Sequence, residues 1–224
     1  MLKNIKDERL DRLIIRKDFN YQYNIELIEF LKKNINEQQD LIKTLNFIDR
    51  LDFIHPGLNS NEYMIHPLRL AVILYKIDNN VNINTIIIAL LHNIFEVTKI
   101  KEEEFLLLYD RELMDALKIL TVNRQIEHDI VYKEEYYSKI FNHSKELAIV
   151  KAIDKFDNLF LLCLNPNKKI REKYLIDIEK FIYPIIKKYI PSVFIYYKNL
   201  VQDCKETGFL DKNKSLKIYN KNYS

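Results

Sequence analysis

Residues 84–97 read NTIIIALLHNIFEV, and this stretch decides the fold class. Residues 86–88 alone would suit a strand as well as a helix. The apolar pattern, however, continues at helical spacing through Leu90, Leu91 and Ile94. Because the whole apolar segment is longer than a typical strand, we predict a buried helix that extends to about Val97.

Composition supports an all-α domain. The chain has 224 residues, of which 48% are apolar and only two are glycine. Hairpins with tight turns need residues that tolerate positive φ, and dinucleotide- or phosphate-binding loops need glycines at fixed positions. We therefore predict a helical bundle with helical extensions at both ends. One expected helix, in residues 1–20, forms a peripheral arm. The other expected helices span residues 24–34, 38–53, 67–77, 84–97, 101–109, 111–121, 132–141, 145–164, 168–188 and 192–206.

Several classes of protein are excluded by the sequence. Apolar runs such as residues 86–91 are far shorter than the ~18 residues that span a bilayer, and no secretory signal opens the chain. Cys163 and Cys204 make no metal or redox spacing, which favours a reducing compartment. The net charge of +3 is spread over mixed charges and does not demand nucleic acid. We expect a cytoplasmic protein with no membrane or nucleic-acid partner.

Polar residues inside apolar segments are the candidates for chemistry. His66 precedes an expected helix, His92 and Glu96 are four residues apart, and Asp154 lies in a second apolar segment with Asn158 one turn later. Imidazoles with carboxylate or amide oxygens form a ligand set for Mn, Fe or Zn. A carboxyl group one turn away could transfer a proton.

Each of these residues also has a purely structural explanation. A single histidine in an apolar helix is more often a hydrogen-bonded core residue, and a buried Asp154 needs a partner that Lys151 would supply. By spacing alone, metal binding is the less favoured interpretation. His128 and Asp129 lie in a polar context and are predicted to be at the surface, whereas His55 and His143 are predicted in loops or at the surface.

Three segments resemble, in order, motifs of the RelA/SpoT-type alarmone hydrolases, which are HD-domain phosphohydrolases. Residues 63–74, YMIHPLRLAVIL, resemble YI-HP---VA-IL, and residues 89–98, ALLHNIFEVT, resemble ALLHD--EDT. Residues 150–159, VKAIDKFDNL, resemble VKLADRL-NL. The resemblance implies an all-α HD domain with one divalent metal ion, often manganese, that removes the 3′-pyrophosphate from ppGpp or pppGpp.

The resemblance also implies roles for individual residues. Glu96 matches a catalytic acid. The implied metal ligands are His66, His92 and Asp154, with Asn93 in place of the family's Asp. Asn158 matches a nucleotide-contacting Asn and Lys155 the basic residue beside the metal Asp, and Lys151, one turn before Asp154, is a further nucleotide-binding candidate from its position alone.

This chain departs from the family motifs at three places. Asn93 stands where the family has Asp, so the ligand is neutral and we predict a weakly occupied metal site. Val97 stands where the family has a second catalytic acid. The loop at residues 57–63 lacks the basic pair that contacts guanine in the family, so base recognition of that kind is not expected.

We expect an N-terminal helical extension over residues 1–42, an HD-type domain over 43–190, and a C-terminal helix with a loose basic tail over 191–224. Two functions remain open. One is metal-dependent hydrolysis of an alarmone or related small nucleotide, and the other is a degenerate HD module that binds a nucleotide or a protein partner without turnover. A homo-oligomer is compatible with either.

Overall fold

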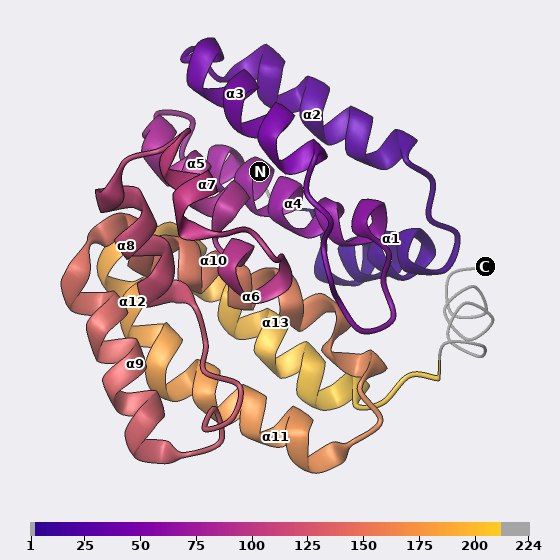
Figure 1. Ribbon diagram of the computed structural model, residues 1–224. Coiled ribbons are helices and arrows are strands. Elements are labelled where there is room, and N and C mark those ends of the chain that lie inside the picture. Colours follow the sequence, from indigo (N-terminus) through magenta and orange to yellow (C-terminus); the bar gives the residue numbers. More distant parts are fainter. Residues whose placement is uncertain (1–2, 212–224) are drawn as a thin grey trace.

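The computed structural model describes residues 3–211, and every regular element in that range is a helix (Figure 1). This confirms the predicted all-α class. The α-helices are α1 (Ile5–Lys17), α2 (Gln22–Asn34), α3 (Gln38–Asp49), α4 (Ser60–Ile77), α5 (Ile83–Leu91), α6 (Ile94–Val97), α7 (Glu102–Leu106), α8 (Arg111–Leu120), α9 (Ile130–His143), α10 (Lys145–Leu161), α11 (Lys168–Asp177), α12 (Tyr183–Tyr189) and α13 (Phe194–Thr207). Short 3-10 turns at Leu162–Leu164 and Pro191–Val193 and a π-helical turn at Ile178–Ile182 join some of them.

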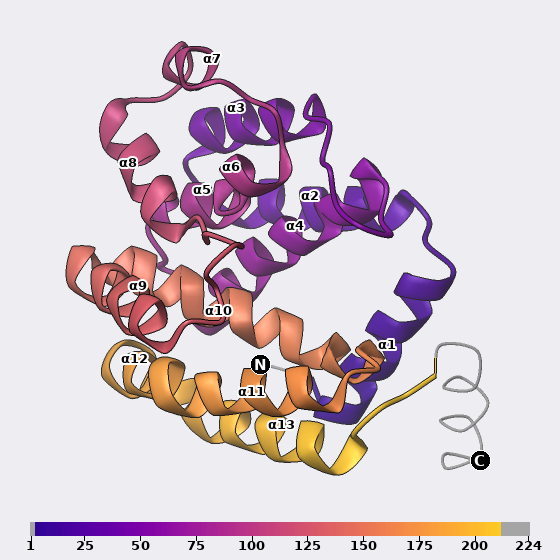
Figure 2. The ribbon, with the colours of Figure 1, turned by 60° about the horizontal axis from the view of Figure 1, so that its bottom comes forward.

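Helix α10 forms the centre of the bundle. It packs against α4 and α5 on one side and against α12 and α13 on the other (Figure 2). Val150, Ala152 and Ile153 of α10 are fully buried, and α5 is buried along nearly its whole length. Helix α5 is apolar on nearly every face, as expected of an enclosed helix, whereas α10 also carries buried charged residues. Any charged side chain that α10 directs into the interior therefore needs a partner from a neighbouring helix.

Helix α4 begins at Ser60 and not at Pro67 as expected. Asn59 caps it: the side-chain oxygen of Asn59 accepts from the Glu62 backbone at 3.0 Å, and the Glu62 carboxylate accepts from the Asn59 backbone at 2.8 Å. This reciprocal capping box satisfies the first backbone donors of the helix. Pro67 is thus inside α4, and His66 lies within a helix and not at its start.

The apolar segment predicted as one helix to Val97 is interrupted. Helix α5 ends at Leu91, His92 and Asn93 form a turn, and α6 begins at Ile94. Asn93 has φ −110° and ψ 9°, outside the helical region. The expectation that His92 and Glu96 lie on one face of a single helix is therefore wrong, because the turn at His92 and Asn93 changes the direction of the backbone before Glu96.

The N-terminal helix is not a peripheral arm. Helix α1 packs against α10 (Figure 2), and its Arg9 and Arg12 are buried. Arg9 donates to the carbonyl of Phe160 at 3.2 Å and to the hydroxyl of Thr207 at 3.1 Å, and it forms an ion pair with Asp203. These contacts tie α1 to both α10 and α13. The domain boundaries at residues 42 and 190 remain predictions.

The C-terminal half follows the predicted pattern with one modification. The helix expected over residues 168–188 contains the π-helical turn just before Pro184, which cannot donate a backbone hydrogen bond. Gly208 ends α13 with φ 62°, as its position predicts. Of the expected tail, residues 212–224 lie outside the described residues. No helix among residues 3–211 is both long and apolar enough to cross a membrane.

Candidate metal centre and cavity

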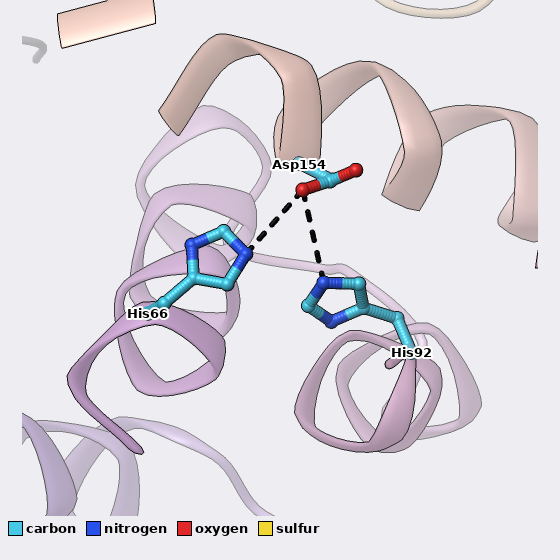
Figure 3. Close-up of side chains that lie close together, drawn as sticks. All are labelled: His66, His92 and Asp154. Carbon is cyan, nitrogen blue, oxygen red and sulfur yellow. Dashed lines mark ion pairs between the residues drawn. The ribbon is translucent and has the colours of Figure 1, made fainter. Parts of the chain in front are cut away.

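His66, His92 and Asp154 converge at one point, from α4, from the turn after α5 and from α10 (Figure 3). One possible ligand atom from each residue lies within 4.8 Å of the other two. The Asp154 Oδ1 atom is 3.3 Å from His66 Nε2 and 3.8 Å from His92 Nε2. We refer to these three residues as the His–His–Asp cluster.

His92 presents a bare nitrogen to the cluster. Its Nδ1 atom lies 2.8 Å from the carbonyl oxygen of Ala89, which can only accept, so Nδ1 carries the proton. Its Nε2 atom is buried and has no hydrogen-bond partner. Burial lowers the pKa of His92 to about 4, which keeps the ring neutral at neutral pH. An unprotonated, unpartnered imidazole nitrogen beside a carboxylate fits a divalent metal ion.

Asp154 is held as a carboxylate. Burial would raise its pKa, but the charge of the nearby Lys151 ammonium opposes burial, and the pKa lies well below its usual value. The Lys151 ammonium lies 3.1 Å from Oδ2, and the Asn158 amide donates to Oδ1 at 2.8 Å. Lys151 is therefore the structural partner that the sequence suggested for Asp154, as well as a candidate for nucleotide binding.

Asn93 and Glu96 bond elsewhere in the described structure. The Asn93 amide donates to the Tyr63 hydroxyl at 2.9 Å. The Glu96 carboxylate accepts from the backbone of Val122 at 2.8 Å and pairs with Arg124, also at 2.8 Å. Glu96 is only 6% exposed, whereas Arg124 is 68% exposed. We refer to Glu96, Arg124 and the Val122 amide as the rim.

Two residues of the cluster, His66 and Asp154, and the rim border an open cavity of about 800 Å³. Its wall includes His66, Asp154, Glu96 and Lys155, together with Arg16 from α1. The Lys155 ammonium lies 4.9 Å from the centre of the Tyr174 ring. Burial, together with the nearby Lys151, lowers the pKa of Lys155 to about 8. The wall has eight Lys and Arg side chains and six Asp and Glu side chains, and a space of this size can hold a charged small molecule.

Comparison with known proteins gives a consistent result. No family model matches the chain. A curated guanosine-3′,5′-bis(diphosphate) 3′-pyrophosphohydrolase of Borreliella burgdorferi is 23% identical over 147 residues, which is 63% of this chain but only 22% of that protein. A solved structure titled as a metazoan ortholog of SpoT that hydrolyses ppGpp has a TM-score of 0.54 at 16% identity, covering 81% of this chain and 94% of the other.

The chain has the all-α HD-domain fold of that solved structure. This fold explains why residues so distant in sequence meet: α4, α5 and α10 pack around one another, and each of the three helices, or the turn after it, contributes one residue of the cluster.

The histidines outside the cluster lie at the surface or in a loop. His128 is 75% exposed and His143 is exposed, in agreement with their predicted surface positions. His55 lies in the loop before α4, where its ring is 5.2 Å from that of Tyr63.

The sequence did not predict a second set of polar residues, which contacts the His–His–Asp cluster from outside. The Asp157 carboxylate accepts from His66 Nδ1 at 2.7 Å and from Arg69 at 2.9 and 3.0 Å, and it also pairs with Arg12. Helical spacing carried a signal, because Arg69 and Asp157 each follow a cluster residue by three positions. Arg12 had no such signal, since only the packing of α1 on α10 brings it near.

Proposed function

We propose that the chain is a metal-dependent phosphohydrolase that removes pyrophosphate from ppGpp, pppGpp or a related small nucleotide. The observation that carries the proposal is the bare, buried Nε2 atom of His92, which lies beside the Asp154 carboxylate. A structural histidine would use both ring nitrogens. This one leaves a lone pair directed at two other candidate ligands.

In this proposal His66, His92 and Asp154 hold the metal ion, with Asn93 as a neutral fourth candidate. When bound, a divalent ion such as manganese supplies Lewis-acid chemistry to a phosphoester. The role of the chain is to present two imidazoles, of which the His92 ring is neutral, and one carboxylate. Burial of His92 and the ion pair of Asp154 with Lys151 prepare both groups in the required protonation state.

Lys151, Lys155 and Asn158 are proposed to contact the nucleotide. All three border the cavity on one side of α10. Two ammonium groups attract phosphate oxygens, and an amide can bond a sugar hydroxyl. Lys155 is the better candidate for direct contact with phosphate, because Lys151 is already paired with Asp154.

Glu96 is proposed as the group that transfers a proton. Its carboxylate borders the cavity and is oriented by the Val122 amide and by Arg124. Arg124 is mostly exposed, so it can move away from Glu96 without disrupting the core. With Val97 in place of a second acid, Glu96 acts alone, and we expect slower turnover than a pair of acids would give.

The test is release of pyrophosphate from ppGpp by the full chain supplied with Mn²⁺, with metal content measured beforehand. We expect release that stops on chelation and is absent in Asp154→Asn. The matched control is Asp203→Asn, which removes a carboxylate that pairs with Arg9, away from the cavity. Absence of release from a folded, Mn²⁺-saturated chain would contradict the proposal.

A second function, nucleotide binding without turnover, is favoured by the rim. The carboxylate of Glu96 is occupied by Arg124 and by the Val122 amide, and Val97 offers no proton acceptor. In that case calorimetry would show ppGpp binding to the full chain with no pyrophosphate released. Lys155→Ala would weaken that binding.

A further inference from the structure

Four donors converge on the carboxylate of Asp157, one turn beyond Asp154 on α10. Arg12 and the Nε atom of Arg69 donate to Oδ1, while Arg69 Nη2 and His66 Nδ1 donate to Oδ2 at 2.9 and 2.7 Å. The Asp157 side chain is 1% exposed. A buried charge with this many partners is strongly oriented, because each oxygen is fixed by two donors.

The two arginines hold Asp157 ionised. Each of the two arginines brings a guanidinium group into contact with the Asp157 carboxylate, and a carboxylate paired with two permanent cations is ionised. An ionised carboxylate can only accept hydrogen bonds. The hydrogen shared with His66 therefore belongs to Nδ1 of the histidine.

We propose that Asp157 is a positioning residue for the metal centre: held by Arg12 and Arg69, it accepts the Nδ1 proton of His66 and so directs the Nε2 lone pair toward His92 and Asp154. Carboxylates that bond the outer nitrogen of a ligating histidine fix both its tautomer and its ring orientation. The inference deepens the proposed function, since it rests on a metal ion bound by the His–His–Asp cluster.

This arrangement makes the N-terminal helix part of the metal centre. Arg12 also donates to the carbonyl of Asp157 at 3.1 Å, and its guanidinium lies 4.1 Å from the centre of the Phe160 ring. Arg69 comes from α4, the helix that carries His66. Asp157 is thus held from two directions, and α1 supplies one of them.

The first test reads the tautomer of His66 in the metal-free full chain by long-range ¹H–¹⁵N NMR, at an alkaline pH where the ring is neutral. In Asp157→Asn, the amide oxygen is expected at the Oδ1 position, where two arginine donors require an acceptor. The amide nitrogen would then face His66 and donate to Nδ1. We expect the proton on Nδ1 in the wild type and on Nε2 in Asp157→Asn. An unchanged tautomer would overturn the positioning role.

The second test measures the affinity of the same chains for Mn²⁺ alone by calorimetry. Loss of an outer partner of a ligand typically costs about 10–100-fold in metal affinity, and we expect a loss in this range for Asp157→Asn. Arg12→Met should cost about 10-fold. The matched control is Arg9→Met, which removes the other buried arginine of α1, one that does not bond Asp157 in the described contacts.

Equal Mn²⁺ affinities of Arg12→Met and Arg9→Met, with both variants folded by circular dichroism, would contradict the role of α1. If the wild-type chain itself does not bind Mn²⁺, the proposed function fails. The tautomer measurement needs no metal and still decides whether Asp157 orients His66. The two failures are therefore distinguishable.

Discussion

His66 and Asp154 of the His–His–Asp cluster border the same cavity as the rim, yet the polar atoms of the cluster and of the rim are bonded differently. In the cluster, the outer nitrogens of both histidines are occupied by Ala89 and Asp157, and their inner nitrogens face Asp154. At the rim, both oxygens of Glu96 are bonded by Arg124 and Val122. The cluster leaves the Nε2 atom of His92 without a hydrogen-bond partner, although both oxygens of Asp154 are bonded by Lys151 and Asn158. The rim leaves neither oxygen of Glu96 without a partner.

This difference indicates which step of the proposed reaction is weakened. The buried cluster is arranged to accept a cation with little rearrangement. Of the departures from the family motifs, Val97 follows Glu96 of the rim directly in the sequence, and it leaves Glu96 without a second acid. We therefore expect metal binding to be better preserved than turnover, and each prediction below would sharpen or break that contrast.

The largest effect is expected from restoring the missing acids. Asn93→Asp together with Val97→Asp should raise Mn²⁺-dependent turnover of ppGpp by about 10²–10⁴-fold, the usual contribution of an acid–base group. The Tyr63 hydroxyl, which now accepts from Asn93, can donate to the new carboxylate. Release of pyrophosphate is the measurement, and adding His92→Ala to the double variant should erase the gain. A folded, Mn²⁺-loaded double variant that stays inactive would favour the binding module.

Loss of a cluster nitrogen should affect metal binding more than loss of any outer partner. His92→Ala is expected to weaken Mn²⁺ binding by more than about 100-fold, the upper end for outer partners. Calorimetry on the full chain is the measurement. His55→Ala is the control, since His55 is a partly buried histidine outside the cluster. Similar losses in both variants would show that the cluster is not the metal site.

Lys155 should make phosphate binding depend on pH. Because its pKa is lowered to about 8, the ammonium is charged at pH 7 and largely neutral by pH 9. A hydrogen bond from a charged group contributes about 1.5 kcal/mol or more, so affinity for inorganic pyrophosphate should fall about 10-fold as pH rises through 8. The control is Lys155→Arg, whose side chain stays charged over this pH range. The ratio of the wild-type affinity to the Lys155→Arg affinity removes the effect of the titration of pyrophosphate itself. A ratio that is constant with pH would exclude Lys155 from phosphate contact.

The smallest effect is expected at the rim. Arg124→Ala should lower the free energy of unfolding by less than about 1 kcal/mol, because an ion pair with an exposed arginine gains little over water. Urea denaturation is the measurement. Lys180→Ala, which removes an exposed pair with Glu134, is the matched control. A loss of several kcal/mol at Arg124 would mean that the rim is as rigid as the cluster.

Much of the fold follows from apolar spacing in the sequence. Ile86 to Leu91 and the apolar face of α10 are long periodic segments, and the helices predicted there exist. The predicted helix boundaries were wrong where polar residues or proline alter the backbone. Helix α4 begins before Pro67, because the capping box of Asn59 and Glu62 satisfies the first backbone donors of the helix. At His92 and Asn93 the chain turns, although the apolar periodicity continues on both sides.

The sequence by itself determined the helical class. It also identified His66, His92 and Asp154 as candidate site residues, since charged or polar side chains in apolar helices must find partners. Only the tertiary structure decided what those partners are. Asp157 bonds His66 because α4 crosses α10, and Arg12 reaches Asp157 because α1 packs on α10. Spacing along a helix reports which side chains share a face. The partner across an interface depends on how two helices pack, which no local pattern encodes.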